Sequence, residues 1–245
     1  MAAVTSQSMV GPYSYVAKVE KQQIQEDQTG LNADSGTFYT LIRNPILESH
    51  ILTLRAPGTE NDLFRKHMKK VGEYLAFSLA STLPTKTQTI VTVLQAEASH
   101  NVIDTKVVLV PILRAGLPLV EGMHKIFPQA EEGFLGYKRD ETTLQPHGYA
   151  NPLPKLEGKT VIVGDPMIAT GGTIKAALNV ISAKNPKAIY VVGAIAAKVG
   201  LEVIHKAYPC IPIYVAAVDP VLNDKGYIVP GLGDAGDRSF GIKDE

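Results

Sequence analysis

The chain has 245 residues, and its 24 Lys and Arg balance its 24 Asp and Glu, so its formal net charge is zero. A neutral chain has no bulk field to draw it to nucleic acid or to an anionic membrane, which excludes a general nucleic-acid binder but leaves room for a small basic phosphate site. The length and a hydrophobic content of 45% are typical of a soluble globular protein with one sizeable core. Cys210 is the only cysteine, so no fold-stabilising intrachain disulfide is expected.

The N-terminal region shows no basic segment followed by an apolar run, so no secretory signal is predicted. The uncharged apolar stretch 188–197 has about half the length that a membrane span needs. We therefore expect a cytoplasmic protein without a membrane partner. Residues 1–36 are rich in Gln, Ser, Thr and Gly and have no sustained period, which predicts a flexible N-terminal extension before a single domain over residues 37–245.

The first predicted helix follows Pro57-Gly58 and ends before Pro84. Thr59 is expected to cap it, with Asp62 three residues later as in a capping box. Apolar side chains at helical spacing mark one face of this helix: Phe64, Met68, Val71, Leu75 and Leu79. This face predicts a packing helix.

From residue 106 onward, continuous apolar runs alternate with helix-length segments. The predicted buried strands are Val107–Val110, Val161–Val163, Ile189–Ile195 and Ile211–Val218, and the predicted helices are Leu117–Phe127, Thr173–Lys184 and Lys198–Tyr208. This alternation predicts an α/β fold with a mostly parallel central sheet flanked by helices. Ligands of such sheets bind beyond the carboxyl ends of the strands, so the segment after each strand is where functional residues are expected.

The segment after the second of these strands combines a carboxylate with a glycine turn. Gly171 and Gly172 permit a tight turn that aims successive N–H groups at one point, and the hydroxyls of Thr170 and Thr173 add donors at a helix N-terminus. This is a cradle for a monophosphate, and it is not a Walker loop because no Lys precedes Thr173. Asp165 can accept hydrogen bonds from sugar hydroxyls beside it. The alternative is a strand-to-helix turn in which Asp165 only caps.

Residues 163–173, which read Val-Gly-Asp-Pro-Met-Ile-Ala-Thr-Gly-Gly-Thr, resemble the phosphoribosyl pyrophosphate (PRPP) motif of the type I phosphoribosyltransferases. The resemblance implies that the phosphate loop, residues 165–173, binds PRPP. Its members here are Asp165, Pro166, Met167, Ile168, Ala169, Thr170, Gly171, Gly172 and Thr173. Many members of that superfamily carry two adjacent acidic residues, whereas Gly164 precedes a single Asp165 here, so ribose binding rests on Asp165 with help from elsewhere.

The C-terminal segment contains Gly231-Leu232-Gly233-Asp234-Ala235-Gly236, which satisfies the dinucleotide-binding spacing G-x-G-x-x-G. That motif requires a following helix and strand, and only nine residues remain after Gly236, so an oxidoreductase is excluded. A glycine-rich backbone can instead present N–H and C=O groups to the edge of a flat ligand. Uracil offers a donor between two acceptors, and cytosine would leave buried groups unpaired. A tail that only packs is the alternative.

Residues 227–238, followed by Phe240-Gly241, resemble the closing segment of uracil phosphoribosyltransferases. The resemblance extends from about residue 44 to the C-terminus. It implies that this base loop, residues 227–238, forms a hood that binds uracil, largely through backbone groups, and that Asp234 also reaches PRPP. The implied uracil-binding residues are Tyr227, Ile228, Gly233, Asp234 and Ala235. Asp219 and Asn223 lie just upstream in a pattern that relatives share.

Two arginines are candidates for the pyrophosphate of PRPP, because a guanidinium donates two parallel charged hydrogen bonds to phosphate oxygens. Arg114 follows a predicted strand, and Arg139 begins a polar segment that resembles the family's flexible β-arm. The alternatives are that Arg114 pairs with a carboxylate and that Arg139 lies on a solvated loop. We take Arg114 and Asp234 as the catalytic candidates.

The family resemblance implies transfer of the phosphoribosyl group of PRPP to uracil, giving UMP and pyrophosphate. Mg²⁺ is expected to arrive on PRPP, without direct protein ligands. The resemblance further implies a homodimer or homotetramer and makes GTP a candidate activator. Two rival hypotheses remain, a PRPP or nucleotide sensor without activity and a purine phosphoribosyltransferase. The Gly233-Asp234-Ala235 stretch argues against the sensor, and the short loop without a large aromatic at its tip argues against purines, although Phe240 lies nearby.

Overall fold

The computed structural model describes residues 32–34, 38–139, 146–150 and 152–241. A ten-stranded sheet forms its centre, in the order β1-β2-β12-β11-β9-β5-β7-β8, with β6 beside β5 and β10 beside β11. All described pairs in this sheet are parallel except β1 with β2 and β7 with β8. The strands are β1 Asn32–Asp34, β2 Thr40–Arg43, β5 Val107–Leu113, β6 Glu131–Glu132, β7 Leu135–Arg139, β8 Pro146–Ala150, β9 Thr160–Gly164, β10 Met167–Ile168, β11 Ala188–Ala197 and β12 Ile213–Asp219.

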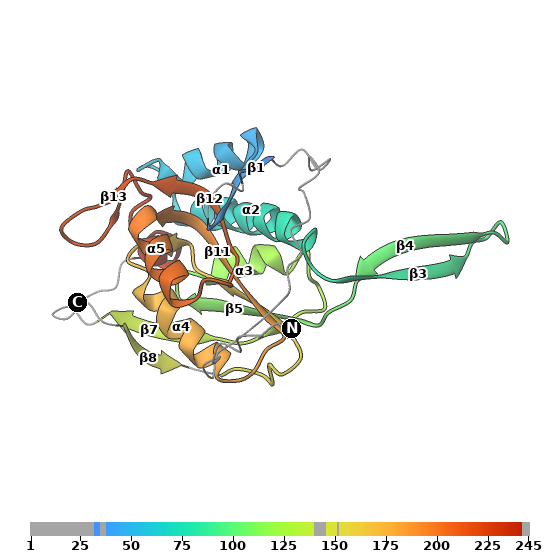
Figure 1. The fold of residues 1–245 in the computed structure, drawn as a ribbon. Helices are drawn as coiled ribbons and strands as arrows, with labels where there is room; N and C mark the ends of the chain where they lie inside the picture. Colours follow the sequence, from blue (N-terminus) through green and yellow to red (C-terminus); the bar gives the residue numbers. More distant parts are fainter. Residues whose placement is uncertain (1–31, 35–37, 140–145, 151, 242–245) are drawn as a thin grey trace, which may run out of the picture.

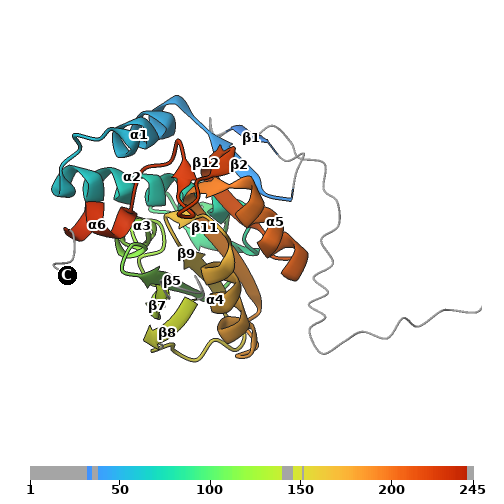
Figure 2. The same cartoon turned by 90° about the vertical axis from the view of Figure 1, so that its left-hand side faces the viewer.

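Helices cover both faces of this sheet, as Figure 2 shows. They are α1 Pro45–Arg55, α2 Asn61–Ala80 and α3 Leu117–Met123 on one face, α4 Gly172–Ser182 and α5 Lys198–Ala207 on the other, and the short α6 Ala235–Phe240 beside α2. Side chains of a strand alternate between two cores: Leu109 packs with α2 and α3, whereas Val108 and Val110 pack with α4 and α5. Burial on both faces explains the continuous apolar runs, and the predicted fold class is confirmed.

The strand and helix positions predicted from residue 106 onward are close to the observed ones, and two predictions of helix ends, one in α3 and one in the earlier α2, depart from the structure. α3 ends at Met123, four residues before the predicted end at Phe127. The predicted cap of α2 is wrong, because Glu60 occupies the N-cap without a side-chain bond. The Thr59 hydroxyl instead donates to the carbonyl of Thr53 in α1 at 2.6 Å, so it closes the α1–α2 connection.

Two hairpins extend from the body. β7 and β8 pair antiparallel at the place predicted for the polar β-arm, and residues 140–145 between them lie outside the described residues. The hairpin of β3 Thr85–Val91 and β4 Glu97–Ile103 was not predicted, and it projects far from the body (Figure 1). Every residue of β3 is exposed, so its sequence has no apolar pattern from which the strand could be predicted.

A small antiparallel pair, β13 Val221–Leu222 and β14 Ile228–Val229, leads into the C-terminal segment. Most of the predicted N-terminal extension lies outside the described residues, apart from β1, which pairs with β2. Within the described part of the chain, no helix combines the length and the apolar character that crossing a membrane requires.

Candidate functional site

The phosphate loop leaves the carboxyl end of β9 and returns into α4. β10, inside the loop, pairs with β11, so the loop is fixed to the sheet at Met167 and Ile168. Gly171 is the N-cap of α4 with φ of 78°, and a Cβ there would lie 2.5 Å from the carbonyl oxygen of Gly200. Only glycine fits such a position. Gly172 follows as the first residue of α4 and is partly exposed, so its N–H is one of the backbone donors at this helix N-terminus that have no helical acceptor.

The side chains of the loop differ in what they can offer a ligand. Ile168 is buried and Pro166 also faces the interior, so only their backbone is available. Thr170 is exposed, and its Oγ1 accepts a long hydrogen bond of 3.5 Å from the N–H of Gly172. Thr170 precedes the N-cap of α4 and Thr173 lies in its first turn. The contact of their hydroxyls with a phosphate stays a prediction.

Asp165 is a buried carboxyl at the end of β9. Burial raises its pKa to about 7, the N–H of Met167 at 3.2 Å opposes that rise, and the charge of Asp234 adds to it. A carboxyl of this kind is only partly ionised at neutral pH. Hydroxyl groups that donate to it would stabilise the ionised form, so it suits a ribose ligand.

The C-terminal segment lies beside the loops that follow β5 and β9. Asp234 is close enough to raise the pKa of Asp165, and Asp237 pairs with Arg114. A Cβ on Gly236 would lie 3.9 Å from both the Ala115 Cβ and the Arg114 Nη2. Phosphate loop and base loop, which are far apart in sequence, thus share one region at the carboxyl ends of the strands.

Arg114 follows β5 directly, as predicted, and it pairs with a carboxylate. Its Nη2 lies 3.2 Å from the Asp237 Oδ1, and both side chains are 36% exposed. Its guanidinium carbon lies 6.0 Å from the ring centroid of Phe240, and its peptide bond to Leu113 is cis. The pair is exposed enough to open at small cost when an anion competes for the guanidinium.

Arg139, the other predicted arginine, is the last residue of β7, and its side chain lies outside the described part of the structure. β7 is joined to β5 in parallel register, so the end of β7 points to the same side of the sheet as the end of β5. Its predicted contact with pyrophosphate stays a prediction.

The base loop combines buried, capping and exposed positions. Ile228 is buried in β14, whereas Tyr227 beside it is 42% exposed. Asp234 is the N-cap of α6, where its Oδ1 accepts from the N–H of Asp237 at 2.9 Å. Gly233 is exposed with φ of 77°, and Ala235 is buried. The predicted uracil residues therefore lie on one short segment, and Asp234 also holds that segment in shape.

Sequence reasoning missed the residues that hold the base loop in place. Arg55 at the end of α1 pairs with the buried Asp219, and Arg238 reaches carbonyl oxygens near the same helix end. Asp219 was noted only for its position in a shared pattern. A single arginine in the last turn of a helix carries no signal of its distant partner, so only the fold could reveal these contacts.

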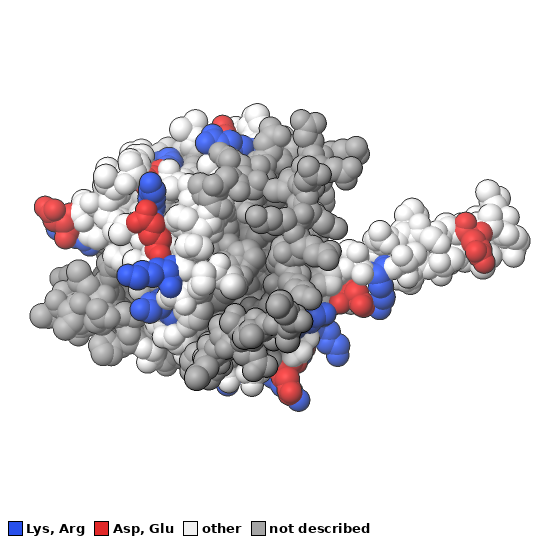
Figure 3. Space-filling model, in the orientation of Figure 1, with Lys and Arg blue, Asp and Glu red and all other residues white. Residues whose placement is uncertain are grey.

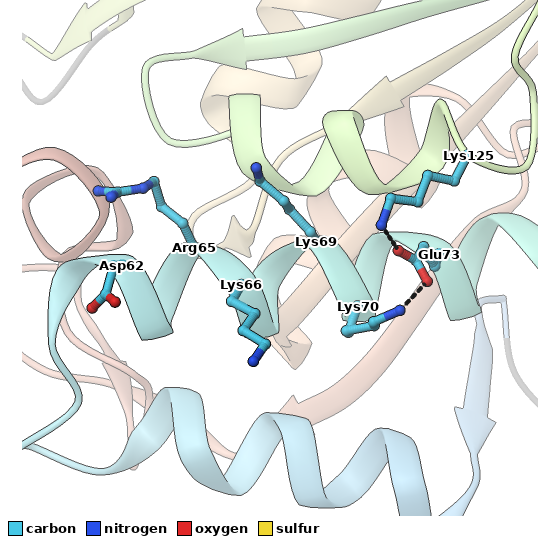
Figure 4. A pocket seen from close by; sticks show the side chains of 7 residues that line it. All are labelled: Asp62, Arg65, Lys66, Lys69, Lys70, Glu73 and Lys125. Atoms are coloured by element: carbon cyan, nitrogen blue, oxygen red, sulfur yellow. Dashed lines mark hydrogen bonds and ion pairs between the residues drawn. The ribbon is translucent and has the colours of Figure 1, made fainter.

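A cavity of about 370 Å³ lies along α2, and Arg65 in its lining donates to the carbonyl oxygen of Ser239 in α6. Figure 4 shows its lining side chains, which are Asp62, Arg65, Lys66, Lys69, Lys70, Glu73 and Lys125. Glu73 pairs with Lys70 and with Lys125, and Lys69 pairs with Glu121. The cavity is a cationic hollow, and none of the residues predicted to bind PRPP or uracil lines it.

Metal-binding chemistry near the phosphate loop is limited to single carboxylates. Among the described residues there is no group of three or more His, Cys, Asp or Glu side chains that could hold a metal ion. Asp165 is buried with a raised pKa, and Asp237 is engaged by Arg114. Single carboxylates of this kind would suit a hydrated cation that a ligand brings and holds.

Comparison with known proteins gives a consistent result. The family model for uracil phosphoribosyltransferase matches residues 41–242. The uracil phosphoribosyltransferases of Halalkalibacterium halodurans and Dictyoglomus thermophilum are each 41% identical to this chain, covering 82% and 83% of it and 96% and 99% of their own lengths. A solved protein structure from Aquifex aeolicus is 39% identical with a TM-score of 0.78, covering 82% of this chain and 97% of the other.

Proposed function

The chain belongs to the uracil phosphoribosyltransferase family, and from this premise we propose how its residues divide the reaction. The enzyme transfers the 5-phosphoribosyl group of PRPP to uracil and yields UMP and pyrophosphate, a reaction of pyrimidine salvage. The observation that supports the division of roles is the ion pair between Arg114 and Asp237, whose Nη2 and Oδ1 atoms lie 3.2 Å apart. It places the base loop against the loop that follows β5, and the charge of Asp234 raises the pKa of Asp165 at the start of the phosphate loop. A sugar-phosphate loop and a base loop thus share one site, as a reaction between a sugar and a base requires.

The phosphate loop binds the 5-phosphate and the ribose of PRPP. Backbone N–H groups at Gly171 and Gly172, the hydroxyls of Thr170 and Thr173, and the N-terminus of α4 surround the phosphate. Asp165 accepts hydrogen bonds from the ribose hydroxyls. Two features support this assignment. A side chain at Gly171 would collide with the Gly200 carbonyl oxygen, and hydrogen-bond donors would stabilise the ionised form of the buried Asp165.

The base loop binds uracil between Ile228 and the Gly233–Ala235 backbone. Ile228 is buried and offers a fixed wall, while Gly233 exposes its backbone. Asp234 orients the base toward the ribose, since its carboxylate is held at the start of α6 and its charge reaches Asp165. Backbone donors and acceptors match the edge of uracil, and cytosine would leave them unpaired.

The chemical step needs no covalent protein nucleophile. N1 of uracil attacks the anomeric carbon, the bond from that carbon to pyrophosphate breaks with its electron pair going to pyrophosphate, and the N1 proton passes to solvent. Positive charge develops on the ribose and negative charge on the leaving pyrophosphate, so positioning and electrostatic stabilisation supply most of the rate. Arg114 leaves Asp237 to bind the departing pyrophosphate, and Arg139 approaches it from the end of β7. Mg²⁺ brought by PRPP would supply positive charge to the pyrophosphate, with no direct protein ligand.

We propose that the enzyme is a homo-oligomer and that the β3–β4 hairpin contacts a second copy of the chain. An isolated two-stranded hairpin is only marginally stable in water, and this one carries exposed apolar side chains at its end. Val93 is 95% exposed, Leu94 86% and Val91 64%. Figure 3 shows this end as a largely uncharged surface.

The double substitution Val93→Asp and Leu94→Asp tests the role of the hairpin. We expect the mass in solution, measured by sedimentation, to fall to that of one chain. Val199→Asp is the matched control, because Val199 is 46% exposed on α5 and lies away from the hairpin. An unchanged mass in the hairpin variant would contradict the proposal.

We propose that GTP, as an activator, binds at the cationic hollow on α2. The hollow has five cationic and two acidic side chains. None of the ion pairs found among the described residues involves Lys66, so its charge is available to a triphosphate. Figure 4 shows Lys66 on the opposite side of α2 from Lys69. GTP should raise the initial rate of the unmodified enzyme and leave that of Lys66→Glu unchanged, with the exposed Lys187→Glu as control. Equal activation of all three enzymes would place the effector elsewhere.

Two further proposals concern location and domain limits. We propose that the enzyme works in the cytoplasm, in agreement with a chain whose one cysteine requires no oxidising compartment. We also propose that residues 37–245 form the catalytic domain, since the family match begins at residue 41. Cell fractionation tests the first, and activity after removal of residues 1–36 tests the second.

A direct assay tests the proposed function. The protein is incubated with PRPP, Mg²⁺ and one free base at a time, and the nucleotide product is identified. UMP should form with uracil, and no nucleotide should form with cytosine, hypoxanthine or guanine. Binding of PRPP without any product would favour the sensor hypothesis, and a purine nucleotide would favour a purine phosphoribosyltransferase.

A further inference from the structure

Arg55 connects the end of α1 to the base loop through a closed set of hydrogen bonds. Its Nη1 and Nη2 donate to the two carboxylate oxygens of Asp219 at 2.8 and 2.7 Å. Its Nη1 also donates to the carbonyl oxygen of Gly231 at 2.8 Å, and the Gly231 N–H returns to the Asp219 Oδ2 at 3.0 Å. Both polar backbone groups of Gly231 are therefore held by one ion pair.

Arg238 makes a second connection, from the base loop back to α1. Its Nη1 donates to the carbonyl oxygens of Leu232, at 2.9 Å, and of Leu54, and its Nη2 donates to that of Ala56 at 2.6 Å. Carbonyls at a helix C-terminus lack helical partners, so Arg238 satisfies groups that α1 leaves open. Its guanidinium carbon lies 4.6 Å from the ring centroid of Phe64 in α2.

The ion pair between Arg55 and Asp219 is largely buried, so its geometry is fixed. The Asp219 side chain is 6% exposed and that of Arg55 is 21% exposed. A planar guanidinium fixes both the distance and the orientation of the carboxylate that it pairs with. Gly231 has φ of 62°, and a Cβ there would lie 2.0 Å from the carbonyl oxygen of Ile228, so this part of the loop tolerates no other residue.

The two connections divide the base loop into an anchored part and a free part. Gly231 and the Leu232 carbonyl are occupied, whereas nothing in the described part of the chain accepts the N–H of the exposed Gly233. This free N–H directly follows the anchored groups. A displacement of the anchor would therefore move the groups assigned to uracil.

We propose that Arg55 and Asp219 are positioning residues that place the base loop and thereby set the affinity for uracil and its discrimination from cytosine. This inference rests on the proposed assignment of uracil to Gly233–Ala235. The α1 end acts as a fixed support, and neither residue needs to contact a substrate. The phosphate loop, which holds most of PRPP, is built on β9, β10 and α4, so its shape does not depend on this pair.

The test compares Arg55→Gln, Asp219→Asn and the double variant by steady-state kinetics. We expect each single variant to raise the KM for uracil about tenfold, equivalent to about 1.4 kcal/mol, with the KM for PRPP unchanged. The double variant should be no worse than either single one, because the two residues act as a unit. Arg55→Lys should restore part of the uracil affinity, since Lys keeps the charge and loses the planar fork.

Two controls separate positioning from general loosening of the fold. Lys86→Met breaks the exposed Lys86–Asp104 ion pair and should leave both KM values unchanged. Ile181→Val loosens the core beneath α4 and should lower the melting temperature without a selective loss of uracil affinity. A uracil KM that is unchanged in folded Arg55→Gln, or that rises in parallel with the PRPP KM, would overturn the proposal. An unmodified protein that forms no UMP would instead refute the proposed function.

Discussion

The phosphate loop and the base loop open on the same site, yet they are held in different ways. The phosphate loop is shaped by its own sequence: Gly171 turns the chain, β10 pairs with the neighbouring strand, and α4 begins at once. The base loop is held by side chains from distant segments, since Arg55 lies 176 positions from the carbonyl that it binds in Gly231.

This difference indicates where each loop is sensitive to change. Substitutions within the phosphate loop should act directly on PRPP, because the loop needs little outside support. Substitutions that weaken uracil binding can lie far from the base loop in sequence. A family motif can therefore identify both loops and still omit the residues on which one of them depends.

Gly172→Val is expected to have the largest effect among changes at the phosphate loop. Its Cβ would meet only the Thr170 Oγ1, at 3.6 Å, so the fold should tolerate it, while the side chain would occupy the space of the phosphate. Loss of two charge-assisted hydrogen bonds, about 4 kcal/mol in total, corresponds to a loss of PRPP affinity on the order of 1000-fold. Calorimetric titration with PRPP measures it.

Gly171→Ala is the matched variant, because its Cβ would lie 2.5 Å from the Gly200 carbonyl oxygen at a φ of 78°. Its main effect should be a lower melting temperature. Normal PRPP affinity in folded Gly172→Val would refute the cradle.

Arg114→Ala should lower kcat/KM for PRPP by about 100-fold, the usual cost of removing one donor that stabilises developing negative charge. The fold should remain intact, because the ion pair with Asp237 is 36% exposed on both sides and such pairs add little stability. Asp237→Asn is the control: it frees Arg114 and should keep the PRPP-dependent rate. Unchanged kinetics in Arg114→Ala would remove this arginine from pyrophosphate binding.

Asp165 makes PRPP binding dependent on pH. Since its pKa is raised from 3.8 to about 7, the carboxyl is protonated in acid and becomes a full acceptor for ribose hydroxyls only as the pH rises through about 7. We expect kcat/KM for PRPP to rise about tenfold per pH unit below that value. Asp165→Asn should show a lower rate and lose this part of the pH profile, which separates it from the titration of PRPP itself.

The same pKa fixes the sign of the effect on stability. A raised folded-state pKa means that the folded protein binds the proton more tightly, so stability present in acid is lost as the pH rises from 3.8 to about 7. The loss is at most roughly 4 kcal/mol. Thermal unfolding of Asp165→Asn at pH 8 should therefore occur at a higher temperature than that of the unmodified protein. An equal or lower temperature would contradict the buried ionised state.

Much of the central fold could be predicted because burial on both faces leaves an unambiguous pattern. The run at Val107–Val110 and the glycines at Gly171 and Gly172 are local signals, and both were interpreted correctly in their structural setting. α1 escaped prediction although Asn44 caps it with bonds to two backbone N–H groups, because few of its residues are buried. The β3–β4 hairpin has no buried face at all, so its sequence carries no core pattern.

The positions of site residues next to strands and turns could be predicted from the sequence, whereas their contacts with residues distant in sequence could not. Asp165 could be placed at a strand end, but its raised pKa depends on burial and on Asp234, which only the folded chain supplies. The position of Arg114 after β5 could be predicted, but its pairing with Asp237 could not. The capping role of Thr59 was predicted from spacing, yet its hydroxyl had a better acceptor in α1.

Gly233→Ala is expected to have the smallest effect, and it tests whether the free part of the base loop is as strict as the anchored part. Gly233 has φ of 77°, which costs another residue about 1 kcal/mol, but its Cβ would meet only the Arg238 Cδ at 3.4 Å. We expect the KM for uracil to rise about fivefold with the KM for PRPP unchanged. Gly231→Ala would collide with the Ile228 carbonyl at 2.0 Å and should lose far more uracil affinity. Equal losses in the two variants would show that the whole loop, and not only the part next to Arg55, is rigidly held.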